Sequence, residues 1–574
     1  MQMTCAGTSK GNATVAVLIH DASELALAEL DEAVFSAFRH FGIPFRLELL
    51  EDVLNNTIIF QEICSSAVLF VPQSGTMGRL SSTGMQMLRS AVHNGLGLVC
   101  YEQDVTLLPG WIQGLFSLSS LPQASEKFTK LVTMSTNHFI TWTRTAAEQV
   151  SSDQPLVYGI QTLATPNTVL ANEHGRSLLE CDVFGEGKVV LFPFSIQLFT
   201  MDYVGHACGA DDIFTRSIIW AARKPFATWS MPPKAGLVID DCSGSYNHFG
   251  YLKVLNHHRW SPYLGLFTDT IDEVAHEDIH KAARKLHEGW VDGTLDIGFH
   301  ALRYNNSFCF NHLERRPLSD SELSDRFACW DRYENDWGIR HSKWAHPHFG
   351  EISSAAIPYY IERGIEFITY LLPLDAAWFD VPSRIPSLPS FPPFGHPGYY
   401  MTPLPEYSQV MGCNCVLDHK RRTTSDYVVR TDYLWNHTPF WDESVEPNIQ
   451  ESALTLADQI RRGLDAGFYG EGATHEQRIA CLREGELQEI FQEADRLLSR
   501  YEFERCTISS ILPLIRTRMK TRLLTIDQTG ANGMLKYSFL NSEAVGTELQ
   551  IYTDSEKGIQ TTRHEVKTKE GEVV

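Results

Sequence analysis

The sequence predicts a multidomain α/β protein with an amino-terminal doubly wound parallel sheet, a central incomplete (β/α)7 barrel and a small carboxy-terminal antiparallel β domain. Apolar runs alternate with amphipathic helical stretches over most of the chain. A Pro-rich segment at 224–233 interrupts this alternation, and short strand-like runs replace it after residue 507. We therefore expect domains at 1–228, 232–503 and 504–574.

Composition and charge limit the class of protein. A chain of 574 residues is too long for one core, and 43% hydrophobic with 21% charged residues is typical of globular proteins. The net charge of -22 disfavours nucleic-acid and anionic-membrane partners, which would be repelled. The first residues have no signal-peptide pattern, and no apolar run is long enough to span a membrane. We therefore expect a cytoplasmic protein with a carbohydrate or small-molecule substrate.

The cysteines point to the same compartment. The chain has 12 cysteines but no CxxC motif, and Cys413 and Cys415 are the one close pair. Scattered cysteines of this kind are typical of reduced, buried thiols. A disulfide framework or a cysteine zinc site is not expected.

The amino-terminal domain is predicted from repeated strand and helix patterns. Amphipathic helices connect the apolar runs, which indicates βαβ units and a mostly parallel sheet. The expected strands are 14–21, 45–50, 67–72, 97–101 and 188–194, and the expected helices are 25–41, 81–94 and 212–223.

One segment of this domain carries a family resemblance. Gly185-Glu-Gly-Lys-Val-Val-Leu-Phe-Pro-Phe194 resembles a late strand of the class I glutamine-amidotransferase-like domains. In that family the nucleophilic cysteine stands on a glycine-flanked turn after a strand. The nearest candidate, Cys100, is followed by Tyr101 and lacks the glycine. The resemblance therefore implies the fold, and we expect this domain to be non-catalytic.

The central domain continues the alternation beyond the Pro-rich segment, which we interpret as a linker. About seven strands with helical crossovers indicate an incomplete barrel, whose active centre would lie at the carboxyl ends of the strands. The expected strands are 235–241, 263–268, 295–300, 344–349, 365–372, 428–437 and 468–475, and the expected helices are 271–287, 320–337, 355–364, 451–466 and 476–498.

Two further regions complete the prediction. The segment 380–406 is rich in proline and aromatic residues and includes Tyr399 and Tyr400. It is interpreted either as a substrate wall on which a sugar could stack or as a loop packed by its own prolines. Beyond residue 507, alternating runs at 523–526, 534–539, 548–552 and 560–563 indicate a small antiparallel β domain.

The chemistry is expected at the ends of the central strands. An apolar run ends on Asp240 and Asp241, which are either a catalytic or metal-binding pair or caps of a turn. Several histidines fall at predicted strand ends, where barrel side chains converge. A carboxylate with two imidazoles is a common zinc set that leaves one position open for water. The histidines are His300, His346, His348, His437 and His475.

These motifs together resemble the polysaccharide deacetylase (carbohydrate esterase 4-like) superfamily over residues 232–500. Val238-Ile-Asp240-Asp241 matches its first motif, Asp296-Ile-Gly-Phe-His300 the start of its second, and 346–351 lies in the position of its third. The resemblance implies that Asp240 is the general base and that Asp241 and His300 are metal ligands. It also implies that His475 or His437 is the general acid.

Two departures leave the third metal ligand open. The resemblance implies a second histidine four residues after His300, and this chain has Tyr304 there. The arginine of the third motif is replaced by His346. On a strand, His346 and His348 would point to the same face, so either could supply the absent imidazole. The other interpretation is a degenerate site that binds no metal.

The predicted function is a metal-dependent hydrolase that removes an acyl group, most simply acetyl, from an amino sugar or related amide. The expected cofactor is a divalent metal ion, and Zn²⁺ is the preferred candidate. One alternative is a glycoside hydrolase that pairs Asp240 with Glu351 or Glu476. Another is a non-catalytic carbohydrate-binding or scaffold protein. The oligomeric state is left open, with a homo-oligomer possible, because composition does not determine it.

Overall fold

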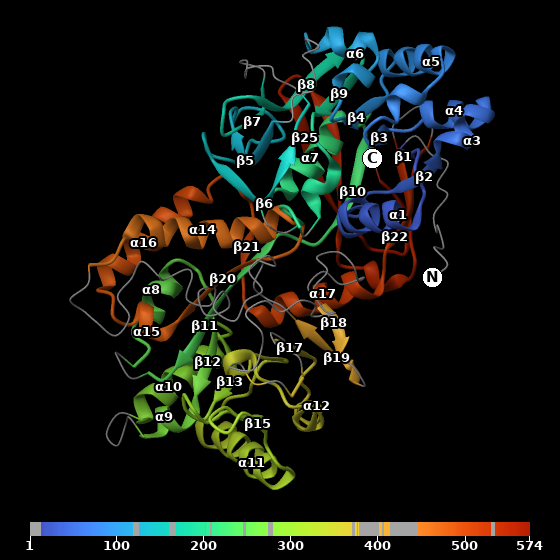
Figure 1. Cartoon of the computed structure of the whole chain (residues 1–574). Coiled ribbons are helices and arrows are strands. Elements are labelled where there is room, and N and C mark those ends of the chain that lie inside the picture. The colour runs from blue at the N-terminus through green and yellow to red at the C-terminus, as the bar shows by residue number, and fades with distance from the viewer. Residues whose placement is uncertain are drawn as a thin grey trace.

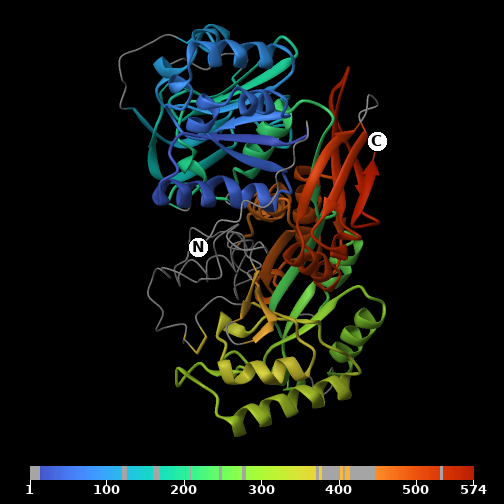
Figure 2. The same ribbon diagram turned by 90° about the vertical axis from the view of Figure 1, so that its right-hand side faces the viewer.

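A computed structural model gives the arrangement of the chain (Figure 1). The amino-terminal domain and the region that carries the Asp and His motifs lie at opposite ends of the molecule, and the chain's last strands lie beside the amino-terminal domain (Figure 2). The structure describes residues 13–118, 126–159, 168–200, 202–206, 209–244, 248–273, 279–369, 374–375, 377, 401–404, 407–413, 446–529 and 534–573.

A nine-stranded sheet organises the amino-terminal domain. Its first half, β2-β1-β3-β4-β9, is parallel, as predicted. Its second half is antiparallel and had not been predicted. The strands in spatial order are β2 (Phe45–Leu49), β1 (Val15–Ile19), β3 (Val68–Val71), β4 (Gly97–Tyr101), β9 (Gly187–Phe192), β8 (Ser177–Phe184), β7 (Leu170–Asn172), β5 (Lys127–Thr133) and β6 (Gln149–Val157).

Helices pack on this sheet through amphipathic faces. In α5 the side chain of Ser81 accepts a hydrogen bond from the backbone of Gly84, which caps the helix, while Leu88 and Val92 are buried. The predicted helix at 25–41 forms with a π-helical turn in its middle. The helices are α1 (Glu24–Leu30), α2 (Ser36–His40), α3 (Leu50–Asn55), α4 (Thr57–Cys64), α5 (Ser82–His93), α6 (Gly110–Leu115) and α7 (Asp211–Ala221).

The central region contains two sheets rich in parallel strands. A hydrogen bond from the Ser342 amide to the Ile297 carbonyl, 2.7 Å, links strand β13 to the segment that leads into β16. The mixed α/β class with parallel sheets is confirmed, and closure into a barrel stays a prediction. The first sheet has the order β13 (Asp296–Ala301), β12 (Tyr263–Phe267), β11 (Lys234–Cys242), β20 (Gly470–His475), with β21 (Glu504–Arg505) also on β11; the second has the order β16 (Trp344–Ala345), β17 (Phe367–Thr369), β19 (Tyr407–Cys413), β18 (Met401–Leu404).

The central helices fall near the predicted stretches, but two helices stand in each of the predicted stretches 271–287 and 476–498, and α8 was not predicted. Helix α11 covers the predicted residues and begins with a capping box, in which Ser319 and Glu322 satisfy each other's backbone amides. Its carboxyl end is Gly338, in the left-handed conformation. The elements around the strands are α8 (Leu252–His257), α9 (Thr268–Glu273), α10 (Ile279–Val291), β14 (Phe310–Asn311), β15 (Arg316–Pro317), α11 (Asp320–Trp337), α12 (Ile357–Glu362), α14 (Ile449–Asp465), α15 (Glu476–Ile479) and α16 (Glu484–Leu497).

The carboxy-terminal region differs from the prediction in two respects. The segment interpreted as a linker contains a strand, β10, which pairs antiparallel with β24 and so joins the carboxy-terminal sheets. A helix, α17, precedes the predicted strands. The bounds are β10 (Phe226–Ser230), α17 (Ile508–Lys520), β22 (Leu523–Thr529), β23 (Met534–Phe539), β24 (Glu548–Ser555), β25 (Gly558–Glu565) and β26 (Glu570–Val573).

Partly buried ion pairs join the amino-terminal domain to the central region. The guanidinium of Arg216 on α7 lies 3.0 Å from the carboxylate of Asp465 at the end of α14. Arg461 on α14 reaches Glu148 at 2.6 Å. Breaking one of these pairs would leave a partly buried charge without its partner, which is less favourable than losing an exposed pair. They therefore fix the amino-terminal domain against the central region.

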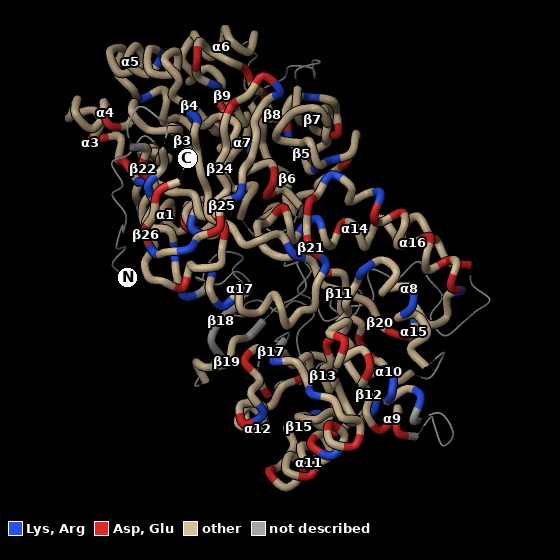
Figure 3. Tube along the Cα trace, turned by 180° about the vertical axis from the view of Figure 1, so that it is seen from behind, with Lys and Arg blue, Asp and Glu red and all other residues tan. Residues whose placement is uncertain are grey.

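The surface carries charges of both signs. Acidic and basic residues are interspersed along the tube at both ends of the molecule (Figure 3). Among the described helices, none is long and apolar enough to cross a lipid bilayer.

Candidate metal centre

A distortion at the end of β11 brings both acidic residues to one place. In a regular strand Asp240 and Asp241 would point to opposite faces. The register between β11 and β12 shifts between Ile239 and Cys242, and Asp241 has φ of 55°. This left-handed residue is an irregularity that re-aims a side chain, as bulges beside functional sites do. Both carboxylates consequently face the same group of histidines.

A glycine on β12 lets the two neighbouring strands bring their side chains together. Gly265 lies between Asp240 on β11 and His300 on β13. A Cβ at Gly265 would lie 2.9 Å from Asp240 Oδ1 and 3.3 Å from the Cβ of His300. A side chain here would therefore displace one of the two functional groups.

The segment after β16 supplies two more imidazoles. The predicted strand at 344–349 is too long, because β16 ends at Ala345 and Phe349 has φ of 58°. His346 and His348 therefore do not lie on one face of a strand, and this part of the prediction is wrong. Both are nevertheless buried at the site, each facing a different carboxylate at 3.2–3.3 Å.

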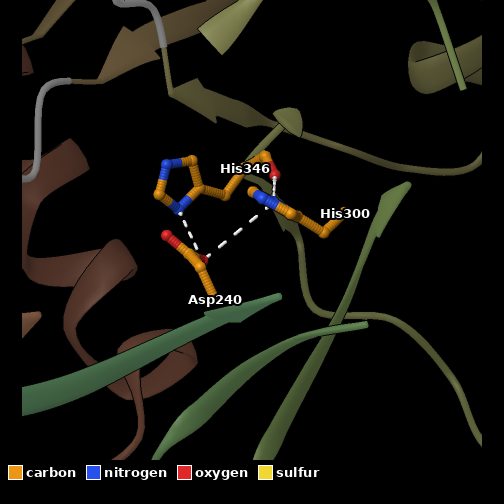
Figure 4. A group of neighbouring side chains, drawn as sticks. All are labelled: Asp240, His300 and His346. Carbon is orange, nitrogen blue, oxygen red and sulfur yellow. Dashed lines mark hydrogen bonds and ion pairs between the residues drawn. The ribbon is translucent and has the colours of Figure 1, made fainter. Parts of the chain in front are cut away.

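Two overlapping groups of side chains could each hold a metal ion. One is Asp240, His300 and His346, and the other is Asp241, His300 and His348. The ring of His346 points toward Asp240, and its Nδ1 lies 3.3 Å from Asp240 Oδ1 (Figure 4). In the other group, Asp241 Oδ1 lies 3.4 Å from His300 Nε2 and 3.2 Å from His348 Nδ1, and the two ring nitrogens are 3.0 Å apart.

The backbone favours the second group. Nδ1 of His300 is hydrogen-bonded to the carbonyl oxygen of His346. A carbonyl only accepts, so Nδ1 carries the proton, and Nε2 keeps its lone pair toward Asp241 and His348. This arrangement, in which the outer ring nitrogen donates to a carbonyl, is usual for metal-binding histidines.

The second group also has the spacing that a tetrahedral ion needs. Bonds of about 2.0–2.2 Å place the ligand atoms of such an ion about 3.3–3.6 Å apart. The three separations here are 3.0, 3.2 and 3.4 Å, so small outward shifts would suffice. Asp241 Oδ1 is buried and has no hydrogen-bond partner within the described part of the chain. The residues present therefore fit a bound divalent cation.

The electrostatics favour ionised carboxylates and a neutral His348. Burial alone would raise the pKa of both carboxyls, but His346 and His300 lower the pKa of Asp240, and His348 lowers that of Asp241 well below its usual range. Burial lowers the pKa of His348, although Asp241 opposes it. The result is ionised carboxylates beside a neutral His348, the forms that bind metal. For His300, burial alone would lower the pKa, but Asp240 and Asp241 raise it.

The end of β20 adds a third side of the site. His475 pairs in register with Asp240, and its Nε2 lies 3.8 Å from Asp241 Oδ2. Gln477 donates from Nε2 to the same oxygen at 2.9 Å. Glu476 turns to the loop after β11 and accepts from the amides of Ser243, 2.6 Å, and Gly244, 2.9 Å.

The remaining predicted residues do not join the group of Asp and His side chains. Tyr304 is 55% exposed, and its ring lies 5.3 Å from that of His348, so it sits at the rim of the site. Cys100 is buried in the amino-terminal sheet, where burial raises the pKa of its thiol well above the usual value. His437 and the aromatic residues of 380–400 lie outside the described residues.

Sequence reasoning missed two residues of the site. Gln477 follows a predicted strand-end histidine by two positions, which was the available signal for it. Gly265 lies within the predicted strand 263–268, and a glycine inside a strand commonly marks a close approach.

Comparisons with known proteins are sparse. No protein-family model and no curated protein matches the sequence. Among solved structures, a proposed polysaccharide deacetylase from Mycobacterium smegmatis is 10% identical with a TM-score of 0.35, covering 52% of this chain and 94% of that one. A peptidoglycan N-acetylglucosamine deacetylase is 12% identical with a TM-score of 0.26, covering 49% of this chain and 91% of that one.

Other solved structures match smaller parts of the chain. A cytoplasmic protein from Salmonella typhimurium is 12% identical with a TM-score of 0.25, covering 37% of this chain and all of that one. Likeness at these levels carries no argument about the reaction. The resemblances to deacetylases and to amidotransferase-like domains therefore stay predictions.

Proposed function

We propose that this protein is a metal-dependent hydrolase that removes an acyl group, most simply acetyl, from an amino sugar or a related amide. The observation that carries the proposal is the buried group of Asp241, His300 and His348, with ligand atoms 3.0–3.4 Å apart and a second carboxylate, Asp240, beside it. One carboxylate binds the ion and the other stays available for proton transfer.

The ligand types favour zinc among the common divalent ions. One carboxylate and two imidazoles form a set that zinc hydrolases use, whereas magnesium and calcium prefer oxygen ligands throughout. When bound, the ion would supply an activated water and polarise the acyl carbonyl. The role of each side chain below follows from its own contacts.

Asp240 is proposed as the general base. It is buried, and the low pKa that His346 and His300 impose keeps it ionised at neutral pH. Its Oδ1 has no partner with hydrogen-bond geometry in the described part of the chain, so this oxygen is free to accept a proton from water. His346, 3.3 Å away, holds the carboxylate and stabilises its charge.

His475 is proposed as the general acid. It ends β20, across from Asp240 in the same sheet, and its side chain is 14% exposed. Strand β20 flanks β11 on the side away from β12 and β13, and a leaving amine there could take up a proton from His475. His437, the alternative from the sequence, lies outside the described residues.

The contacts of two glutamates weigh against a glycoside hydrolase. Glu476 accepts hydrogen bonds from two loop amides and from Tyr251, 3.1 Å. Glu351 is fully buried with both oxygens 2.9 Å from Nδ1 of His312. Neither is a free partner for Asp240 across a sugar cleft. The histidines, by contrast, are accounted for by a metal site.

The test is release of acetate from an N-acetylglucosamine oligomer by the zinc-loaded protein. Asp240→Asn should keep the metal and lose turnover by about 10²–10⁴-fold, the usual contribution of a general base. Asp292→Asn, the same change at an exposed residue on a different surface, is the matched control. Full turnover by Asp240→Asn would contradict the assigned role. A protein that binds no metal would instead favour a carbohydrate-binding or scaffold role.

A further inference from the structure

Gln477 makes a buried contact with the carboxylate proposed to bind metal. Its side chain is 5% exposed, and its Nε2 donates to Asp241 Oδ2 at 2.9 Å. Its own Oε1 has no hydrogen-bond partner among the residues that the structure describes. Burying an amide with one end unsatisfied is costly, so the contact with Asp241 must compensate.

The orientation of this amide follows from charge. Nε2 of Gln477 lies 2.9 Å from Asp241 Oδ2, and a carboxylate that binds a cation only accepts hydrogen bonds. If the amide were flipped, Oε1 of Gln477 would face Oδ2 and repel it. The N–H therefore points at the carboxylate.

The local chain holds the two residues together. Asp241 stands at the bulged end of β11, and Gln477 follows directly after β20, the parallel neighbour of β11. Between them, Glu476 accepts from the amides of Ser243 and Gly244, which ties the loop after β11 to the start of α15. The distance between Gln477 and Asp241 is thus set by backbone contacts on both sides.

We propose that Gln477 is a positioning residue that makes Asp241, rather than Asp240, the metal carboxylate; this rests on the proposed function. Its hydrogen bond occupies Oδ2 and so turns Oδ1 toward His300 and His348. A glutamine suits the task because it donates without carrying a charge, so it does not compete with the cation.

This assignment resolves the symmetry of the two overlapping groups. Asp240 and Asp241 are adjacent acids, and each belongs to one candidate group with His300. Oδ1 of Asp240 faces His346 at 3.3 Å, an imidazole that can exchange protons. Oδ2 of Asp241 accepts from the Gln477 amide, which cannot exchange protons, while Oδ1 of Asp241 faces His300 and His348. The two carboxylates are therefore prepared for different tasks by their neighbours.

The experiment compares metal binding by the wild-type chain and Gln477→Met, which keeps the length of the side chain and removes the donor. Zn²⁺ affinity is measured by competition with a chelator. Gln477→Met should bind about 10–100-fold more weakly, as changes behind a metal ligand usually do. With Co²⁺ as the probe, the visible absorption bands should shift, because the ligand geometry changes. Gln477→Ala should show the same losses and serves as a second variant.

Gln459→Met is the matched control. Gln459 lies on α14 and accepts at Oε1 from the amide of Ala473 on β20, 3.1 Å, so the control removes a comparable contact on the same strand without touching Asp241. It should leave Zn²⁺ affinity and the Co²⁺ spectrum unchanged.

Asp241→Asn separates the two proposals. In one outcome, Asp241→Asn loses Zn²⁺ while Gln477→Met keeps wild-type Zn²⁺ affinity and an unchanged Co²⁺ spectrum. That outcome would overturn the role of Gln477 and leave the metal site standing. Undiminished Zn²⁺ binding by Asp241→Asn would overturn the metal site itself, and the role of Gln477 with it.

Discussion

Gly265→Ala is a small change with a calculable effect on the site. The φ angle of Gly265 lies outside the left-handed region, so alanine is compatible with the backbone. The new methyl group would lie 2.9 Å from Asp240 Oδ1 and 3.3 Å from both Cβ and Cγ of His300. The first distance is shorter than a carbon and an oxygen tolerate, so Asp240, His300 or both strands must move.

The expected magnitude follows from these distances. Relieving the contacts requires shifts of a few tenths of an ångström in a fully buried place, and such overpacking costs about 1–3 kcal/mol. Replacing a glycine by alanine also stabilises the folded protein by about 0.4–1 kcal/mol, because it lowers the conformational entropy of the unfolded chain. We expect a net loss of about 1–2 kcal/mol in the free energy of unfolding. Turnover should fall by about 10-fold or more, because a displacement near 1 Å can cost 10²-fold.

The assay combines urea unfolding, zinc content and acetate release for wild type and Gly265→Ala. Gly485→Ala is the matched control, since a Cβ at Gly485 on α16 would meet no atom within 4 Å. The control should be neutral or slightly more stable. If Gly265→Ala is as stable and as active as the control, the close approach of Asp240 and His300 is not what the site depends on.

Three further predictions concern residues elsewhere in the chain or at the rim of the site. Cys100→Ala should leave acetate release unchanged, because its buried thiol is not a nucleophile, and should cost about 1 kcal/mol of stability. A glutaminase activity of the wild type that vanishes in this variant would overturn the prediction. Tyr304→Ala should leave zinc content unchanged, because the phenol is exposed at the rim, and a protein that loses its zinc would make Tyr304 a ligand. Burial lowers the pKa of Lys224 to about 7, so the unfolded chain binds more protons than the folded one above pH 7, and stability should rise by about 2 kcal/mol between pH 7 and pH 9. The unfolding free energy of Lys224→Met, measured with urea, should lack this rise. If it depends on pH as steeply in Lys224→Met as in the wild type, the lowered pKa of Lys224 is refuted.

Much of the fold follows from periodicity. The parallel strands β1, β3, β4 and β11 to β13 are mostly buried apolar runs bounded by turns, which is the pattern that predicts buried parallel strands. The antiparallel strands β5 to β8 were not predicted, because their half-exposed faces mix polar and apolar residues. Strand β10 lies between prolines, and α17 contains Pro513. Because proline disfavours both strands and helix interiors, the local sequence did not predict either element.

The site was predictable in its residues but not in its geometry. The strand-end positions of Asp240, Asp241 and His300 follow from the pattern of the sequence. The left-handed conformation of Asp241 could not be predicted, because no glycine marks the bulge and only the surrounding packing imposes it. The convergence of His346 and His348 depends on a turn at Phe349, which the strand interpretation excluded.

The central claim is that Asp241, His300 and His348 hold one metal ion. Elemental analysis of the purified protein, dialysed against excess Zn²⁺ and then against buffer, tests it directly, with His348→Ala beside His346→Ala. The account predicts about one equivalent of zinc in the wild type and in His346→Ala, and a loss of nearly all of it in His348→Ala. Full zinc content in His348→Ala, or none in the wild type, would contradict the account.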